Sequence, residues 1–215
     1  MNTVAPKSLE ICAFFGCQYI VVHGFKLARN VGSEAAEWEQ TERFLESLAP
    51  LARELKVTIC MENIYNNIGN HIIEGPCCDA RKAVKRIDCM NEKYGAEVLG
   101  FCFDTGHANL IGLDFEYFIT SLGSRLKVLH IHDNDGIGDL HQIPFTFTRN
   151  RENTSSTDWD GFIKGLQKNC FDGVLSFETA PVLTAFPNVM KNDVLRFIAQ
   201  IGNYFAGKLD YIDVR

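Results

Sequence analysis

The amino-acid sequence predicts an α/β fold built on a parallel sheet. Five short apolar segments have the composition of buried strands, and segments with helical spacing of apolar residues lie between them. Strands and helices that alternate in this order predict right-handed crossover connections and parallel strands. The five expected strands are residues 19–23, 57–62, 100–104, 127–132 and 173–178.

Helices are expected between these strands, and four of them follow a polar residue that can cap a first turn: Ser33, Asp79, Asp114 and Asp160. The first of the four is expected to end near Leu55. Residues 9–17 resemble the end of an earlier helix, and a last helix is expected near residues 189–205. The longest irregular stretch, residues 133–158, is either a functional loop or a surface insertion.

Length and composition indicate one domain over residues 1–215 with a sizeable core, since 46% of the residues are hydrophobic. The net charge of −6 argues against bulk electrostatic binding of nucleic acid. No apolar run is long enough to span a membrane, and the amino-terminal residues lack the pattern of a secretory signal. The eight cysteines show no C-x-x-C pair, so reduced thiols and a cytoplasmic location are expected.

Each expected strand ends in a residue that can bind a metal ion or move a proton: His23, Glu62, Asp104, His132 and Glu178. In barrels of alternating strands and helices, the carboxyl ends of the strands carry the active site. For an isolated glutamate, a position already exposed in the loop would be the simpler explanation. Five such endings in succession favour a single ring of ligands assembled from distant parts of the sequence.

Histidines and aspartates are also interleaved after the third and fourth strands. His107 follows Asp104 by three residues, which suits either a ligand pair or a helix cap followed by a surface histidine. His130 and His132 lie two apart on a strand and therefore on one face. A further pair, Asp139 and His141, follows in the next loop. Oxygen and imidazole ligands without thiolate suit Zn²⁺, Mn²⁺, Co²⁺ or Mg²⁺.

Together these motifs resemble the xylose isomerase-like TIM-barrel superfamily, which includes sugar isomerases, ketose 3-epimerases and endonuclease IV. The motifs are V-V-H-G at 21–24, M-E-N at 61–63, F-D-T-G-H at 103–107, H-I-H-D-N at 130–134, D-L-H at 139–141 and S-F-E at 176–178. The resemblance implies a (β/α)8 barrel of which only the last five strands are visible and the first three are lacking. A neighbouring chain that completes the barrel, or a fragment of a longer protein, would account for the difference.

The resemblance also implies roles for individual residues. A metal ion in the isomerases and epimerases would be held by Glu62, Asp104, Glu178 and either His130 or His132. The K-x-x-H and H-x-x-D spacings favour His130, which we choose, whereas the ketose epimerases point to His132. Glu62 and Glu178 would form the catalytic pair. Substrate contacts would come from His107, His132, Asn63 and Trp159, with core packing as the alternative for Trp159. The pattern of endonuclease IV would place His23 and Glu62 on one metal ion, and His107, Asp139 and His141 on another.

Three functions follow as hypotheses. The first is a divalent-metal-dependent isomerase or epimerase of sugars or sugar phosphates that acts through an enediolate, with Zn²⁺ or Mn²⁺ as the expected cofactor. The second is a metal-dependent phosphodiester hydrolase similar to endonuclease IV. The third is a non-catalytic truncated barrel, because an open sheet exposes its edges. A small sugar and a second copy of the chain are the expected partners, whereas nucleic acid and membrane are not expected.

Overall fold

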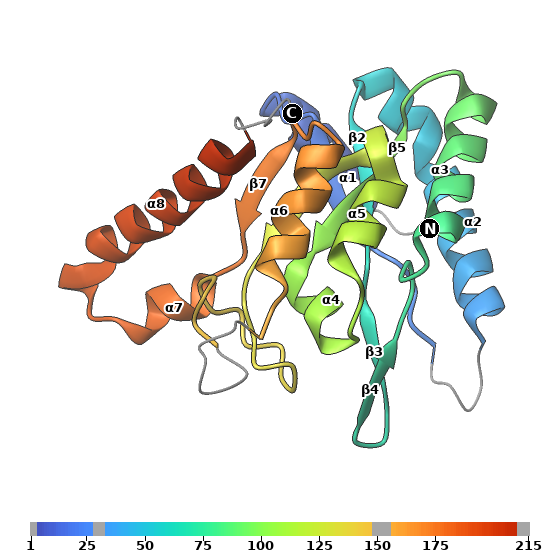
Figure 1. The fold of residues 1–215 in the computed structure, drawn as a ribbon. Helices are drawn as coiled ribbons and strands as arrows, with labels where there is room; N and C mark the ends of the chain where they lie inside the picture. Colours follow the sequence, from blue (N-terminus) through green and yellow to red (C-terminus); the bar gives the residue numbers. More distant parts are fainter. Residues whose placement is uncertain (1–3, 28–32, 148–155, 210–215) are drawn as a thin grey trace.

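A parallel five-stranded sheet forms the centre of the protein in a computed structural model that describes residues 4–27, 33–147 and 156–209 (Figure 1). In spatial order its strands are β1 (Tyr19–His23), β2 (Thr58–Glu62), β5 (Leu99–Asp104), β6 (Leu126–Ile131) and β7 (Val174–Phe177). All five predicted strands are confirmed, and every neighbouring pair is parallel. Over the described residues the sheet has the form of an incomplete α/β barrel.

Eight α-helices accompany the sheet in the described part of the chain: α1 (Val4–Phe14), α2 (Glu34–Leu55), α3 (Ala80–Tyr94), α4 (Thr105–Leu110), α5 (Phe115–Leu122), α6 (Trp159–Lys168), α7 (Ala180–Ala185) and α8 (Lys191–Leu209). Two short 3₁₀ turns span Gly123–Arg125 and Asn188–Met190. A two-stranded antiparallel hairpin, β3 (Tyr65–Ile68) and β4 (His71–Glu74), projects beyond the carboxyl end of β2 (Figure 1). The sequence pattern did not predict this hairpin.

The predicted helix caps are confirmed at three of four positions. Ser33, Asp79 and Asp114 each accept a hydrogen bond from a backbone N–H in the first turn of α2, α3 and α5. The cap of α6 is Asp158 instead of Asp160, because its carboxylate accepts from the N–H of Gly161 at 2.9 Å. Asp160 lies within the first turn of that helix.

Strand alternation divides the sheet into two faces. The outward-facing residues, such as Met61, Phe103 and Leu129, join the main core with the apolar stripes of the surrounding helices. On the inner face, Cys60, Cys102 and Val128 form a separate small cluster. The next inward position along each of these three strands is a residue of the predicted ligand ring, so the ring sits directly above this cluster at the carboxyl edge.

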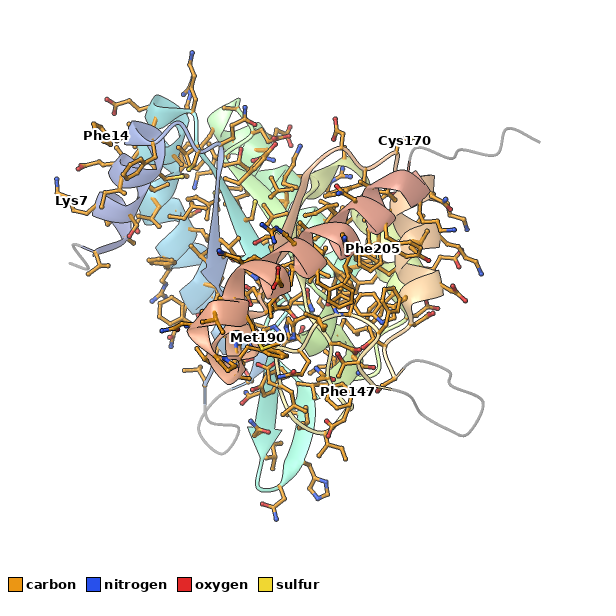
Figure 2. All side chains as sticks on the ribbon, turned by 90° about the vertical axis from the view of Figure 1, so that its left-hand side faces the viewer. Lys7, Phe14, Phe147, Cys170, Met190 and Phe205 are labelled. Carbon is orange, nitrogen blue, oxygen red and sulfur yellow. The ribbon has the colours of Figure 1, made fainter. Side chains whose placement is uncertain are left out.

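Large apolar side chains remain exposed on elements near the two edges of the sheet. Figure 2 shows Phe14 on α1 and Met190 before α8 at the surface, whereas Phe205 of α8 points into the core. The exposed fractions are 84% for Phe14, 44% for Met190 and 0% for Phe205. Of the helices that the structure describes, none combines the length and apolar character needed to cross a membrane.

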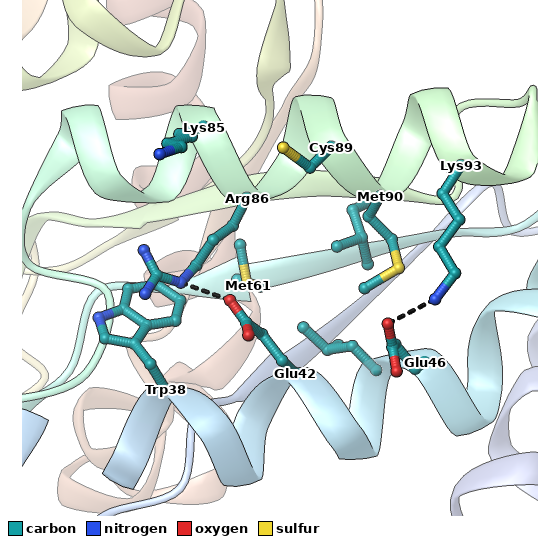
Figure 3. A pocket seen from close by; sticks show the side chains of 11 residues that line it. Trp38, Glu42, Glu46, Met61, Lys85, Arg86, Cys89, Met90 and Lys93 are labelled. Carbon is teal, nitrogen blue, oxygen red and sulfur yellow. Dashed lines mark hydrogen bonds and ion pairs between the residues drawn. The ribbon is translucent and has the colours of Figure 1, made fainter. Parts of the chain in front are cut away.

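A cavity of about 360 Å³ lies between α2 and α3, in the outer helical layer (Figure 3). Its floor is apolar and includes Met61 of β2. Two ion pairs cross its opening, from Arg86 to Glu42 at 2.7 Å and from Lys93 to Glu46 at 2.6 Å. Because side chains alternate along β2, Met61 and Glu62 point to opposite faces, and this cavity is separate from the predicted ligand ring.

Candidate metal centre

Strand register brings the predicted ligands together at the carboxyl edge of the sheet. His23 at the end of β1 is the register partner of Glu62 at the end of β2, and Asp104 of β5 is the partner of His130 of β6. Glu178 follows β7 and its backbone N–H donates to Ile131 of β6 at 3.2 Å. The ring predicted from distant sequence segments is therefore continuous in space.

Glu62 lies at the centre of this arrangement and is 1% exposed. Its Oε1 is 3.1 Å from Nδ1 of His107, and its Oε2 is 3.3 Å from Nε2 of His23 and 3.4 Å from Nδ1 of His130. Burial alone would raise the pKa of Glu62, but the surrounding imidazoles hold that pKa well below its ordinary value. The carboxylate is therefore ionised.

His130 connects Glu62 to the other carboxylates. Its Nδ1 lies 3.2 Å from Oε1 of Glu178 and 3.9 Å from Oδ2 of Asp104. Asp104, His130 and Glu178 each offer a ligand atom within 4.8 Å of the others. Burial lowers the pKa of His130, whereas Glu62, Glu178 and Asp104 raise it, and the net shift is upward. This is the electrostatic environment of a cation site.

Asp104 caps a helix, as one of the two alternatives from the sequence expected, but His107 after it is buried and not a surface residue. Oδ1 of Asp104 caps α4 by accepting from the backbone N–H of His107 at 2.6 Å, and both carboxylate oxygens lie 3.1 Å from Nε2 of His132. The His132 ring is fully buried and occupies the space beside Gly106, where an added Cβ would lie 1.9 Å from Cε1 of the ring. The hydroxyl of Thr105 donates to the carbonyl of His132 at 2.7 Å.

A second group of ligand atoms forms around Asp139. Nδ1 of His107 faces the carbonyl oxygen of Asn63 at 3.0 Å, and Nδ1 of His141 faces that of Glu178 at 2.9 Å. Because a carbonyl oxygen only accepts, Nδ1 of each ring carries a proton. The two Nε2 atoms are then directed to Oδ2 of Asp139, at 3.4 Å from His107 and 3.3 Å from His141. His141 adopts a left-handed backbone conformation, with φ of 48°.

Buried polar atoms without a hydrogen-bond partner test whether a metal ion fits here. Such atoms include both carboxylate oxygens of Glu62, Nδ1 of His130, Nδ1 of His132 and Oδ1 of Asp139. Buried polar atoms are almost always satisfied, so the concentration of such atoms at one place fits a site that can hold a cation. The oxygen and imidazole donors suit a divalent ion. Cys102 also lies close, but burial raises its pKa and keeps it a thiol.

Two of the predicted substrate contacts are buried side chains with structural partners, Asn63 beside the site and Trp159 in the core. Asn63 is fully buried, and its amide bridges to the backbone of Asp104, donating at 3.0 Å and accepting at 2.9 Å. Trp159 is 4% exposed and packs among Phe145, Phe162 and Phe205, so core packing is the correct alternative. Asn63 therefore positions Asp104, and Trp159 stabilises the core.

The sequence pattern missed two residues beside the site. The ring of Tyr65, in the hairpin, lies 5.2 Å from the ring of His107, and the ammonium of Lys26 lies 4.7 Å above the Tyr65 ring. Neither residue belongs to a strand-end motif. The sequence does show a lysine three residues after His23, which could have suggested a residue near the site. Its position beside the hairpin, however, is visible only in the fold.

Comparisons with known proteins agree with this geometry. A family model described as the xylose isomerase-like TIM barrel matches residues 5–196. An uncharacterized protein of Sinorhizobium fredii, y4fM, is 25% identical over 174 residues, covering 80% of this chain and 50% of the relative. The uncharacterized protein MJ1311 of Methanocaldococcus jannaschii is 29% identical over 140 residues, covering 62% and 45%. The chain thus spans about half the length of the curated relatives it matches.

Solved structures share the fold at low sequence identity. The IolI protein with a bound zinc atom superposes with a TM-score of 0.64 at 16% identity, covering 99% of this chain and 70% of that one. A D-psicose 3-epimerase gives 0.63 at 15% identity, covering 95% and 70%. A D-tagatose 3-epimerase-like protein gives 0.60 at 19% identity, covering 93% and 68%. With the family match over most of its length, the chain belongs to the xylose isomerase-like TIM-barrel family.

Proposed function

We propose that the protein is a divalent-metal-dependent isomerase or epimerase of sugars or sugar phosphates. The observation that carries the proposal is the convergence of Glu62, Asp104, His130 and Glu178 from four neighbouring strands. The Nδ1 atom of His130 lies between the carboxylates of Glu62 and Glu178, at 3.4 and 3.2 Å. Three carboxylates and one imidazole are donors that suit Zn²⁺ or Mn²⁺, with Co²⁺ or Mg²⁺ as alternatives.

A divalent ion bound by these four residues would supply electrophilic stabilisation of charge that develops on a substrate carbonyl and its neighbouring hydroxyl. His132 and Asn63 support this set by holding Asp104 from its carboxylate and from its backbone. Such supporting contacts orient ligands and tune their affinity. We therefore assign the ligand role to His130 and the positioning role to His132.

Glu62 and Glu178 are the proposed proton-moving pair. Isomerisation and epimerisation remove a proton from the carbon beside a carbonyl and return it to a different carbon or to the opposite face. One carboxylate takes the proton, an enediolate forms in the substrate, and the second carboxyl group delivers a proton. Glu62 is buried whereas the Glu178 side chain is 36% exposed, so the two groups differ in their access to the substrate side of the site.

The solved structures with this fold support the proposal, since two are a ketose 3-epimerase and a protein similar to one, and the IolI protein carries zinc. Their identities to this chain are below 20%, so they support the fold directly and the reaction only by analogy.

The test begins with elemental analysis of the purified protein. The protein is then loaded with the divalent metal ion and assayed. Ketoses and aldoses, free and phosphorylated, are incubated in D₂O, and NMR follows loss of the C–H proton beside the carbonyl. We expect exchange with at least one substrate, and its loss in Glu178→Gln. Bound metal without exchange in any sugar would contradict the proposed reaction, and a metal-free inert protein would favour the non-catalytic hypothesis.

The second candidate is a phosphodiester hydrolase, which the group around Asp139 specifically favours. Several metal ions can activate a water and stabilise a leaving oxygen. The stoichiometry discriminates, because one ion per chain supports the isomerase or epimerase and two or three support the hydrolase. If the wild type binds one ion per chain, Asp139→Asn should still bind one. If the wild type binds two or three, Asp139→Asn should bind fewer.

Self-association is a further part of the proposal. In the part of the chain that the structure describes, β1 and β7 each pair with one strand only. Unpaired sheet edges favour association with another chain. Light scattering after size-exclusion chromatography should show a homo-oligomer, and a monodisperse monomer at micromolar concentration would contradict this part.

A further inference from the structure

The loop after β1 holds Lys26 in a defined place beside the site, above Tyr65. The backbone N–H groups on either side of Lys26 are both hydrogen-bonded to side chains of α2. The N–H of Phe25 donates to Oγ1 of Thr41 at 2.9 Å, and the N–H of Leu27 donates to Oε1 of Glu37 at 2.9 Å. Thr41 and Glu37 are each 1% exposed. The backbone of Lys26 is therefore anchored although its side chain is exposed.

The same anchor ties this loop to the β3–β4 hairpin. The side-chain amide of Asn66 donates to the carbonyl of Leu27 at 3.4 Å and approaches Oε1 of Glu37 at 3.5 Å. Asn66 follows Tyr65, so the tie brings Tyr65 beneath the Lys26 ammonium, 4.7 Å from the ring centroid. Tyr65 in turn contacts His107, whose Nδ1 lies 3.1 Å from Glu62.

The ammonium of Lys26 lies near the carboxylates of the site but forms no ion pair within the described residues. Over the described residues no carboxylate lies within ion-pair distance of its ammonium, although Asp139, Glu62 and Glu37 are close enough to act on it electrostatically. Burial lowers the pKa of Lys26 while these three carboxylates raise it, with a net downward shift. An ammonium that partly loses water and has no anionic partner favours an anion supplied by a ligand.

We propose that Lys26, held over Tyr65, binds an anionic group of the substrate, either a phosphate ester or a carboxylate. The inference rests on the proposed function and names its substrate class: a sugar phosphate or a sugar acid. A site with the carboxylates of Glu62, Asp104, Asp139 and Glu178 repels anions. A cation beside these carboxylates would offset that repulsion at the position where Lys26 lies. Lysine is a common point-charge partner for phosphate.

Lys26 could instead only offset the charge of the four carboxylates, and the experiment separates the two roles. Three substrates are compared in the D₂O exchange assay: a ketopentose, its 5-phosphate and the corresponding ketouronic acid. Lys26→Ala should lower the ratio of kcat/KM for one charged substrate over the neutral ketose by roughly 10–100-fold, the range for a charge-assisted hydrogen bond. The substrate whose ratio falls identifies phosphate or carboxylate. Lys26→Arg should restore most of the ratio.

Lys85→Ala, which removes an exposed lysine from α3, is the matched control and should leave the ratio unchanged. An unchanged ratio in Lys26→Ala, or equal losses for neutral and charged substrates, would overturn the proposal.

A binding measurement keeps this test separate from the proposed function. Equilibrium dialysis of labelled ketopentose 5-phosphate and ketouronic acid against the metal-loaded protein requires no turnover. If no sugar exchanges its proton but wild type retains either ligand at least tenfold better than Lys26→Ala does, the anion site stands and the proposed reaction fails. Equal retention of both ligands by the two proteins would overturn the anion site.

Discussion

The inner face of the sheet has two layers that differ sharply in chemistry although they are two residues apart. The lower layer is Cys60, Cys102 and Val128, and the upper layer is Glu62, Asp104 and His130. Each strand contributes one residue to each layer, because inward positions recur every second residue. The lower layer provides apolar packing beneath the site, and the upper layer provides the donors. Stability and chemistry can therefore be changed separately.

The two layers also differ in the charge of their side chains. Burial raises the pKa of the Cys60 thiol to about 12, so the lower layer stays neutral. In the upper layer, burial also favours a higher pKa for Glu62. The neighbouring imidazoles outweigh burial, lower the pKa and keep the carboxylate ionised. Burial penalises charge in both layers, and only the layer with complementary partners retains charge.

The largest expected effect comes from removing charge in the upper layer. Glu62→Gln should reduce activity by about 1,000-fold, within the range for loss of a general acid or base, and should weaken metal binding as well. Kinetic assays and metal titration check this. Glu39→Gln, on an exposed part of α2, is the matched control. Retention of both activity and metal by Glu62→Gln would remove Glu62 from the centre of the site.

Gly106→Ala should disturb the upper layer without changing a ligand. The added methyl group would collide with the His132 ring, which orients Asp104. We expect metal affinity to fall by about 10–100-fold, as for other losses of a supporting contact. Gly207→Ala in α8 is the control, because no atom lies within 4 Å of the added group. Unchanged metal affinity in Gly106→Ala would show that His132 does not position Asp104.

Val128→Ala should act on the lower layer alone. The lost methyl groups should reduce the free energy of unfolding by about 1–2 kcal/mol, since Val128 is buried on β6 between β5 and β7. Urea denaturation measures the loss, and metal titration should give the wild-type stoichiometry. A change in metal stoichiometry would mean that the two layers are not independent.

The pH dependence of metal-free protein should sharpen the comparison. Burial lowers the pKa of His107, but Asp139 and Glu62 outweigh it and raise that pKa to about 11. This stabilisation is complete below about pH 6.5 and is lost as pH rises toward 11, by up to about 1.4 kcal/mol per pH unit. Urea midpoints with EDTA should therefore fall between pH 7 and 9.

Metal affinity should change with pH in the opposite direction to the urea midpoint. The ligands must release protons to bind the ion, so the affinity rises with pH. His107→Asn should remove much of the pH dependence of the metal-free midpoint. A midpoint that rises between pH 7 and 9 in the metal-free wild type would contradict the raised pKa of His107.

Sequence patterns predicted the features that follow from local periodicity. All five strands and the caps Ser33, Asp79 and Asp114 are confirmed, because apolar alternation and first-turn hydrogen bonds depend on nearby residues. The proximity of the strand-end residues was predicted for the same reason, since each of them ends a strand or follows one closely, and their role as metal ligands stays a prediction. The β3–β4 hairpin was missed because its strands are only four residues long and neither shows the continuous apolar run of a buried strand.

Residues whose roles depend on long-range contacts could not be predicted. Asn63 directly follows a strand, where a residue of the site is expected. Its side-chain amide is instead hydrogen-bonded to the backbone of Asp104, which is 41 residues away in the sequence. Trp159 follows a polar loop, but aromatic residues of α6, α8 and the preceding loop enclose it. Lys26 reaches the site only through the tie between its loop and the hairpin. Residues 148–155 of the long polar loop lie outside the described residues.

The most direct test of the central claim is a crystal structure of the protein with Co²⁺, using anomalous scattering to locate the ion. The account predicts an ion about 2.0–2.2 Å from a ligand atom of each of Glu62, Asp104, His130 and Glu178. An ion bound only by His107, Asp139 and His141, or no ion at this edge at saturating Co²⁺, would contradict it.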